Sequence, residues 1–244
     1  MADHVTDRIV DRAVDRMAEH DALPRRKNVR LLLASSNPGK LREFRALAAT
    51  EAQTIDLALD LIPGFAELPS FPESAPTFAE NAAGKALHYS RFTDLCVMAD
   101  DSGLVVTALG GAPGVHSARY AGPGASDADR IAKLQDELRR VAAAQSAAPT
   151  GRAPGQTLDR GARFVCVIAL AARGRVVAVL SDDVRGEILD QPRGAAGFGY
   201  DPVFLYPPLG KTFAELREEE KNQHSHRSKA FRKLLEFLAS SPVL

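Results

Sequence analysis

The chain contains several short polar segments whose side chains could bind phosphate, a metal ion or a nucleobase. The first spans residues 35–40 and reads Ser35, Ser36, Asn37, Pro38, Gly39 and Lys40. It follows an apolar run and precedes a helical pattern, and the backbone N–H groups at a helix start attract anions. Gly39 would let a ligand come close, and Lys40 adds positive charge. The segment lacks the Walker A pattern, so an ordinary capped helix start is the alternative interpretation.

Two adjacent carboxylates, Asp100 and Asp101, follow the apolar run 95–99 and precede Ser102 and Gly103. Neighbouring carboxylates at the end of a buried strand repel each other and lose hydration, and a hard cation such as Mg²⁺ would relieve both effects. A carboxylate beside a metal ion can also orient or deprotonate a water molecule. The alternative is an Asx turn in which one of the two aspartates caps the chain.

The segment between these two motifs adds an acid and a base. Glu73 lies in a proline-rich loop, and residues 77–80 (TFAE) form a capping box that begins a helix. The capping box explains Glu80 as the capping acid. On the helix, Asn81 and Lys85 share one face, because residues four apart are neighbours. Taken alone, Lys85 is typical of a solvated surface charge.

Two further candidates lie near the C-terminus. Residues 194–201 (GAAGFGYD) place Phe198 and Tyr200 among three glycines, and an exposed aromatic ring on a loop can stack on a nucleobase. The alternative is that these rings fill the core, and the order of the glycines excludes the dinucleotide-binding fingerprint. Residues 221–227 (KNQHSHR) offer donors and charge suited to a purine edge or a phosphate. The alternative there is a polar helix start with a solvated basic face.

The elements that must position these segments alternate between strand and helix. Apolar runs and hydrophobic periodicity predict strands at 29–34, 54–62 and 95–99, with 104–108 continuing or pairing with the last. The runs 164–171 and 176–182 flank Arg173 and Gly174 and predict a hairpin. Helices are expected at 38–49, 77–90, 126–144 and from Ser225 to 238. The order favours the α/β class with a mixed sheet.

Two segments fall outside this pattern. Residues 1–27 carry acids every four residues and predict a solvated helical extension that Pro24 ends. Residues 145–162 are rich in Ala, Gly and Pro and predict a flexible surface insert. The remainder, 28–244, is expected to form a single domain.

The composition excludes several classes of protein. The chain has 244 residues, with 31 Lys and Arg against 31 Asp and Glu, so a global basic field for nucleic acid is absent. No apolar run reaches the length of a membrane-spanning helix, and the first residues lack the apolar core of a secretory signal. Cys96 and Cys166 provide neither a disulfide framework nor a zinc-ligand spacing, which suits the cytoplasm.

Taken together, the segments resemble the family of pyrophosphatases for non-canonical purine nucleoside triphosphates, also called inosine triphosphatases or Ham1-like proteins. The matching runs are ASSNPGKLREF, ESAPTFAENAAGKA, ADDSGLVVTALGGAPGVHSARYAG, GFGYDPVF and EEKNQHSHRSKAF. The resemblance implies cleavage of dITP, ITP or XTP to the monophosphate and pyrophosphate, with Mg²⁺ as cofactor. It implies an elongated mixed β-sheet with flanking helices, two lobes around a central cleft, and a homodimer.

The resemblance also implies roles for individual residues. Residues 35–40 would hold the triphosphate, and Lys85 its phosphates. Asp101 would be the general base and, with Glu73, a ligand of Mg²⁺; Asp100 is a further candidate ligand, and Glu80 would lie nearby. Ser102 would contact the substrate. The purine would be bound by Phe198, Gly199, Tyr200, Asp201, Lys221, His226 and Arg227.

The charge pattern agrees with a polyanionic substrate bound together with a metal ion. Residues 73–101 hold five acids and two bases, whereas residues 221–233 hold five bases and no acid. The first segment would supply the metal side of a cleft, and the second would hold the nucleotide.

Three rival hypotheses remain open: a pyrophosphatase for modified pyrimidine nucleotides, a catalytically silent nucleotide-binding protein, and a nucleic-acid-binding module. The Ser35-Ser36 pair, where the family often has Thr-Gly, is the main departure.

Overall fold

The fold is a seven-stranded mixed sheet flanked by helices, which confirms the predicted α/β class. A computed structural model describes residues 26–52, 55–147 and 158–241. The strand order is β2-β1-β3-β4-β5-β6-β7. β1 pairs in parallel with β2 and β3, and every other neighbouring pair is antiparallel. The strands are β1 (Lys27–Leu33), β2 (Ile55–Leu61), β3 (Cys96–Val106), β4 (Gly161–Ala172), β5 (Arg175–Ile188), β6 (Phe204–Tyr206) and β7 (Lys211–Thr212).

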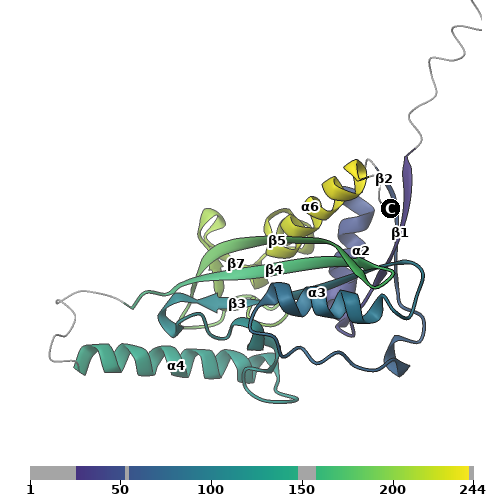
Figure 1. Cartoon of the computed structure of the whole chain (residues 1–244). Helices are drawn as coiled ribbons and strands as arrows, with labels where there is room; N and C mark the ends of the chain where they lie inside the picture. The colour runs from purple at the N-terminus through teal and green to yellow at the C-terminus, as the bar shows by residue number, and fades with distance from the viewer. Residues whose placement is uncertain (1–25, 53–54, 148–157, 242–244) are drawn as a thin grey trace, which may run out of the picture.

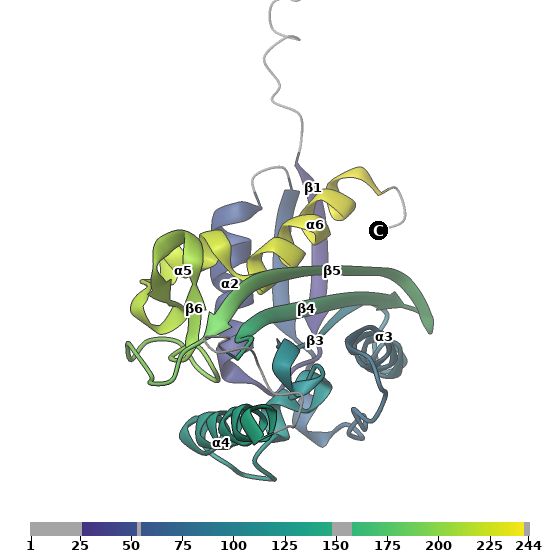
Figure 2. The ribbon, with the colours of Figure 1, turned by 90° about the vertical axis from the view of Figure 1, so that its left-hand side faces the viewer.

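Helices cover both faces of the sheet, as Figures 1 and 2 show. α2 (Pro38–Glu51) and α6 (His226–Ser240) pack on one face, and α3 (Phe78–Tyr89) packs on the other. α4 (Asp127–Ala147) lies below the far end of the long strands, and the short α5 (Glu218–His224) precedes α6. Of the described helices, none is both long and apolar enough to cross a membrane.

The pleat of the central strands separates two apolar layers, since successive side chains point to opposite faces. Met98 of β3 and Ile168 of β4 pack with Phe44 of α2 and Phe231 of α6. Their neighbours along the strands face α3 instead, where they meet small side chains such as Ala82 and Ala86. Because the central strands are covered on both faces, they appear in the sequence as continuous apolar runs.

A second core lies at the other end of the long strands. Leu104 and Val106 of β3 and Phe164 of β4 pack there against Leu134 and Leu138 of α4. Buried residues from 200–216 complete this core. The molecule therefore has two lobes that share β3, β4 and β5, as the resemblance implied.

The structure corrects several predicted boundaries. Of the two alternatives for 104–108, continuation of the strand 95–99 is correct: β3 runs unbroken through the two aspartates to Val106, because β4 pairs with it along its length. α5 was not predicted. Residues 145–147 belong to α4 and 161–162 to β4, while 148–157 of the predicted insert lie outside the described residues. Residues 1–25 of the predicted extension also lie outside them, and Lys27 already belongs to β1.

The hairpin and the helix starts agree with the sequence prediction. Arg173 and Gly174 join β4 to β5 with positive φ angles of 50° and 71°, the backbone conformation that tight hairpin turns require. Asn37, Thr77 and Ser225 each accept a hydrogen bond as the N-cap of α2, α3 and α6. Several of the predicted polar segments therefore lie at the capped N-termini of helices.

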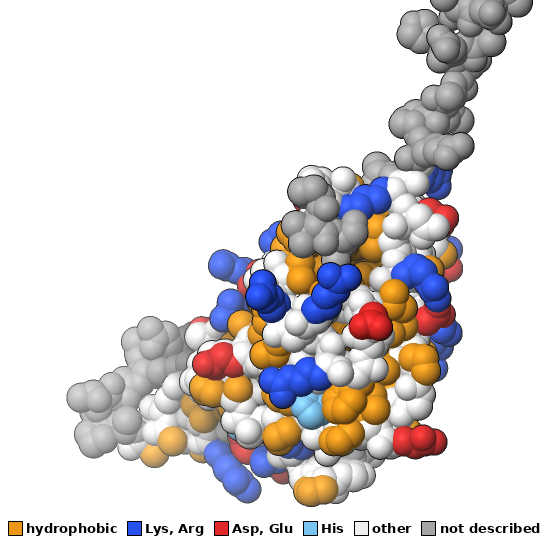
Figure 3. Space-filling model, turned by 45° about the vertical axis from the view of Figure 1, so that its right-hand side comes forward, with side chains coloured by type: hydrophobic (Ala, Val, Ile, Leu, Met, Phe, Trp, Pro, Cys, Tyr) orange, Lys and Arg blue, Asp and Glu red, His pale blue; other side chains and the backbone are white. Residues whose placement is uncertain are grey.

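Figure 3 shows the distribution of charge on one face of the molecule. Lys and Arg side chains lie there at several separate places, between hydrophobic and uncharged ones. Within the basic segment 221–233, Lys221 and Arg227 are buried, whereas Arg232 pairs with Glu51 and Lys233 with Asp182. Only part of the predicted basic segment therefore faces the site described next.

Candidate active site

A cavity of about 1020 Å³ lies where the two lobes meet. It is lined by elements far apart in the sequence, including the loop after β1, the middle of β3, and the start of α6. Most of the residues singled out from the sequence line it, namely Ser35, Ser36, Asn37, Lys40, Glu73, Lys85, Asp101, Ser102, Phe198, Gly199, Tyr200, Asp201, Lys221, His226 and Arg227. Glu80 is exposed and accepts a hydrogen bond from the Thr77 hydroxyl, as expected of a capping acid.

The loop of residues 35–40 is a capped helix start that also borders the cavity. The Asn37 side chain accepts hydrogen bonds from the backbone N–H groups of Gly39 (2.9 Å) and Lys40 (3.2 Å). Pro38 is the first residue of α2, where its missing N–H group costs nothing. A Cβ on Gly39 would lie 3.2 Å from both the Phe198 ring and Asn37 Oδ1, so a larger residue here would require these side chains to shift by a few tenths of an ångström. The two interpretations of this loop are therefore compatible.

Lys40 and Asp100 form a buried ion pair behind the loop. The Lys40 Nζ lies 2.7 Å from Asp100 Oδ2, and the Asp100 side chain is fully buried in β3. Burial alone would raise the pKa of Asp100, but the positive charges of Lys40, Lys85 and Arg227 outweigh it and hold this pKa below its ordinary value. Asp100 therefore stays ionised, and its Oδ1 has no hydrogen-bond partner among the described residues.

Asp101 has the opposite electrostatic environment. Its Oδ2 accepts a hydrogen bond of 3.0 Å from Asn81 on α3. Burial raises the pKa of Asp101, the negative charge of Glu73 adds to the rise, and the contacts with Asn81 and Lys40 offset only part of it. Both aspartates lie within β3, so the Asx-turn interpretation is wrong. Their pKa values are pushed apart, which is the arrangement that assigns different roles to two neighbouring acids.

Lys85 of α3 lies near three acids, Glu73, Asp100 and Asp101, which together are called the acidic group. Its Nζ lies 2.5 Å from Glu73 Oε1, and the Lys85 residue is only 8% exposed. Burial would lower the pKa of Lys85, but the charges of Asp100, Glu73 and Asp101 raise it. Lys85 is thus a buried cation, and its interpretation as a solvated surface charge is wrong. Arg119 donates a hydrogen bond of 2.7 Å to the Glu73 backbone carbonyl and so holds the proline-rich loop that carries Glu73.

The acidic group fits the way in which proteins bind Mg²⁺. Among the described residues, no three His, Cys, Asp or Glu side chains are grouped so that they could hold a metal ion by themselves. Mg²⁺ usually needs only one or two carboxylates, with waters and substrate phosphates as its other ligands. Glu73 and Asp101 are close enough for the charge of one to raise the pKa of the other, and a cation between them would relieve this repulsion.

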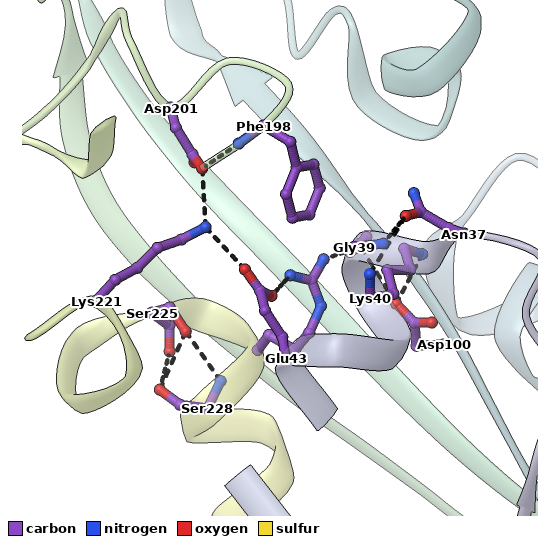
Figure 4. A network of polar contacts seen from close by, with 12 residues as sticks. Asn37, Gly39, Lys40, Glu43, Asp100, Phe198, Asp201, Lys221, Ser225 and Ser228 are labelled. Atoms are coloured by element: carbon purple, nitrogen blue, oxygen red, sulfur yellow. Dashed lines mark hydrogen bonds and ion pairs between the residues drawn. The ribbon is translucent and has the colours of Figure 1, made fainter. Parts of the chain in front are cut away.

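A second buried network surrounds Lys221, as Figure 4 shows. The Lys221 Nζ lies 2.8 Å from both Glu43 Oε1 and Asp201 Oδ2. The other Glu43 oxygen pairs with Arg227, whose guanidinium also donates to the Ser102 hydroxyl at 3.2 Å. Lys221 and Arg227 are 6% and 2% exposed, so the interpretation as a solvated basic helix start is wrong.

His226 belongs to the same wall of the cavity. Its ring stacks on Phe164 with centroids 4.8 Å apart, and its Nδ1 is buried with no partner among the described residues. Burial lowers the pKa of His226 well below its ordinary value, and the positive charges of Arg227 and Lys221 lower it further. The imidazole is therefore neutral at neutral pH.

The loop of residues 194–201 closes the cavity near these cations. Asp201 Oδ2 accepts from the Phe198 N–H at 2.9 Å, and the Phe198 ring lies 5.0 Å from Lys221 Nζ and 5.5 Å from the Arg227 guanidinium carbon. Tyr200 is buried and donates to the Ser117 carbonyl at 3.0 Å. For Tyr200, the core interpretation is therefore correct, whereas Phe198 is only half buried and lines the cavity.

Sequence inspection missed Glu43, the acid that joins Lys221 to Arg227. A signal was present: Glu43 lies three residues after Lys40 and four before the buried Leu47, on the inward stripe of α2. A carboxylate on that stripe must be paired, because an isolated buried charge is very costly.

Comparison with known proteins gives a consistent family. A sequence model of the Ham1 family matches residues 31–237. The chain is 50% identical over 204 residues to the dITP/XTP pyrophosphatase of Geobacillus kaustophilus, covering 84% of this chain and 91% of that protein. It is 49% identical over 205 residues to the dITP/XTP pyrophosphatase of Gloeobacter violaceus, covering 84% and 92% of the two chains.

Solved structures show the same similarity. The HAM1 protein from Coxiella burnetii matches with a TM-score of 0.74 and 38% identity, over 87% of this chain and 100% of that one. The Ham1 protein of Staphylococcus aureus matches with a TM-score of 0.70 and 38% identity, over 86% and 97%. The similarity therefore extends over both lobes and the cavity where they meet.

Proposed function

This chain belongs to the Ham1 family and is a nucleoside triphosphate pyrophosphatase, and we propose that its substrates are the non-canonical purine nucleotides dITP, ITP and XTP. Hydrolysis would yield the monophosphate and pyrophosphate and so remove deaminated purines from the nucleotide pool. The observation that carries this proposal is that the cavity has two parts. One part is the acidic group with Lys40 and Lys85. The other is a buried cationic group, Lys221 and Arg227, next to the Phe198 ring.

Asp101 is the general base that activates the attacking water. Its raised pKa makes it a stronger proton acceptor than an ordinary aspartate, and it borders the cavity. Asp100, whose pKa is lowered, instead keeps Lys40 in place. Lys40 and Lys85 stabilise the negative charge that develops as the phosphoric anhydride bond breaks. Residues 35–37 hold the phosphates at the start of α2.

The proposal includes Mg²⁺ as cofactor, held by Glu73 and Asp101. When bound, the ion would neutralise the phosphates and make pyrophosphate a better leaving group. Lys85 pairs with Glu73 at 2.5 Å and so orients this carboxylate. Asp100, the further candidate ligand, is fully buried against Lys40 and is not among the residues that line the cavity, so its position does not favour this role.

Selectivity for a 6-oxopurine follows from the cationic group. Arg227 and Lys221 can only donate hydrogen bonds, and a 6-oxo group accepts them. The 6-amino group of ATP would place its own hydrogens against these donors and form no hydrogen bond with them, which disfavours ATP relative to a 6-oxopurine. Phe198 supplies the aromatic surface on which the purine stacks.

The proposal also places the enzyme in the cytoplasm as a homodimer. The cytoplasm suits Cys96 and Cys166, which are both buried free thiols. The homodimer rests on the resemblance to the family. Light scattering of the purified protein tests it, and a monomer at all concentrations would contradict it.

The test of the proposed function is pyrophosphate release from a panel of nucleotides with Mg²⁺. We expect dITP, ITP and XTP to be cleaved well above dUTP, modified dTTP and ATP. Preference for the pyrimidines would refute the proposal, and no turnover at all would favour a silent nucleotide-binding protein. Salt-sensitive binding to plain duplex DNA would instead favour a nucleic-acid-binding module.

A matched pair of variants tests the general base. Asp101→Asn should lower kcat by orders of magnitude with the fold intact, whereas Asp94→Asn, at an exposed position just before β3, should leave kcat unchanged. Near-normal turnover by Asp101→Asn would contradict the assignment.

A further inference from the structure

The loop that carries Phe198 is attached to a helix with no assigned part in the reaction. Asp127, the first residue of α4, accepts a hydrogen bond of 2.7 Å at Oδ2 from the Gly199 N–H. The acceptor is a carboxylate, so this bond is charge-assisted and stronger than a neutral one. It joins the start of α4 to the residue that directly follows Phe198.

The Asp127 carboxylate is held on its other side as well. Its Oδ1 pairs with Arg130 one turn along α4. Arg130 also donates to the carbonyl groups of Ala118 (3.0 Å) and Ala125 (2.6 Å) and so holds the chain that leads into the helix. Asp127 borders the cavity, but both of its oxygens already have protein partners. This favours action on the loop rather than on a ligand directly.

The start of α4 is a firm support for this contact. Ser126 Oγ accepts from the Asp129 N–H at 3.1 Å, and Asp129 Oδ2 accepts from the Ser126 N–H at 2.9 Å. This reciprocal pair has the form of a capping box. Further along the helix, Ile131, Leu134 and Leu138 are anchored in the second core.

The loop itself needs such a support. Gly197 and Gly199 have positive φ angles of 76° and 66°, so the loop follows neither a helix nor a strand that would hold it in place. Its position depends on contacts to other elements, which include backbone bonds of Ala196 and Asp201 to Ala214 and the side-chain contacts of Tyr200 to Ser117, Asp201 to Lys221, and Gly199 to Asp127. The Phe198 N–H itself donates to Asp201, which Lys221 holds, and the bond from Gly199 to Asp127 fixes the chain on the other side of Phe198.

We infer that Asp127 is a positioning residue that, supported by Arg130, holds Phe198 where it stacks on the purine. This inference rests on the proposed function. Loss of Asp127 should weaken binding of the nucleobase and leave binding of the phosphates unchanged, because residues 35–40 and Lys85 belong to other elements.

The test uses three variants of the full-length enzyme. Asp127→Ala removes the acceptor, whereas Asp127→Asn keeps an oxygen that can accept from Gly199. Asp136→Ala is the matched control, because Asp136 pairs with Arg139 three residues along the same helix, as Asp127 does with Arg130, but is exposed on α4 away from the cavity. For each variant, the KM for dITP is compared with the inhibition constant of inorganic tripolyphosphate, which carries phosphates but no nucleobase.

We expect Asp127→Ala to raise the KM for dITP about tenfold, because the variant loses one partly exposed, charge-assisted hydrogen bond. The tripolyphosphate constant and kcat should change little, Asp127→Asn should restore most of the loss, and Asp136→Ala should match the wild type. An unchanged KM in Asp127→Ala would overturn the inference. So would an equal rise in both constants, which indicates a merely structural role. A wild-type enzyme that does not cleave dITP would overturn the proposed function and this inference together.

Discussion

Glu43 is the acid on which the buried cationic group depends, and its removal can be predicted in some detail. It contacts Lys221 and Arg227 at once, and both cations are almost fully buried. Removing one partner of a buried ion pair costs about 3–5 kcal/mol, because the other charge is left uncompensated. In Glu43→Gln, Lys221 keeps Asp201 and Arg227 keeps Ser102. The loss of unfolding free energy should therefore lie near the lower limit, at about 3 kcal/mol.

The assay is thermal unfolding followed by circular dichroism. For a chain of this length, about 1 kcal/mol lowers Tm by about 2–4 °C, so Glu43→Gln should lower it by about 6–12 °C. The matched control is Glu51→Gln on the same helix, because Glu51 pairs with Arg232 at 2.9 Å but both side chains are about one third exposed. An exposed pair contributes about 0–1 kcal/mol, so this change should be small. A Tm loss in Glu43→Gln no larger than that in Glu51→Gln would refute the reasoning.

The pH dependence of the same difference gives a second check. Burial would raise the pKa of Glu43, but the charges of Arg227 and Lys221 outweigh it and hold this pKa below the ordinary value of 4.5. A lowered folded pKa contributes stability that is fully present above the unfolded pKa and lost as the pH falls through the folded one. The gap in Tm between wild type and Glu43→Gln should therefore be complete at neutral pH and narrow in acid. A gap that stays constant throughout the acid titration would contradict this.

Three further predictions concern the catalytic side of the cavity. Chelation of divalent cations with EDTA should abolish pyrophosphate release, and added Mg²⁺ should restore it; full activity in EDTA would exclude Glu73 and Asp101 as ligands of an essential metal ion. Lys85→Met should lower kcat about 100-fold or more, as for loss of one preorganised charge at the reacting phosphate, and steady-state kinetics with unchanged kcat would exclude that role. Gly39→Ala should raise the KM for dITP several-fold, because its Cβ would come within 3.2 Å of the Phe198 ring, and an unchanged KM would show that the ring moves freely.

Local patterns were sufficient to predict most elements of the fold. The capping residues Asn37, Thr77 and Ser225 each begin a helix in the structure, because their side-chain oxygens accept the N–H groups that a helix start leaves free. The sequence left open whether the strand at 95–99 continues through the two aspartates, because adjacent aspartates are also typical of a turn. Pairing with β4 and the charges of Lys40 and Lys85 allow the strand to continue through them.

Burial was the property that local patterns predicted least well. Lys85, Lys221 and Arg227 each look like surface charges, and each is buried beside an acid from another element. Their partners lie between 12 and 184 residues away along the chain. No spacing rule connects such positions, because only the packing of α2, α3, α5 and α6 around the sheet brings them together.

The sequence by itself determined most of the order of the elements, the family and many of the polar residues that line the cavity, because these depend on local hydrophobic periodicity, capping and motif. The tertiary structure alone decided which charges meet. It placed the positive charge of Lys40 beside Asp100, which lowers the pKa of Asp100, and it buried Asp101 near Glu73, which raises the pKa of Asp101. It also joined Glu43 to two buried cations and Asp127 to Gly199. The physical reason is that pairing and burial of a charge depend on distances in space, which the positions of residues along the chain do not contain.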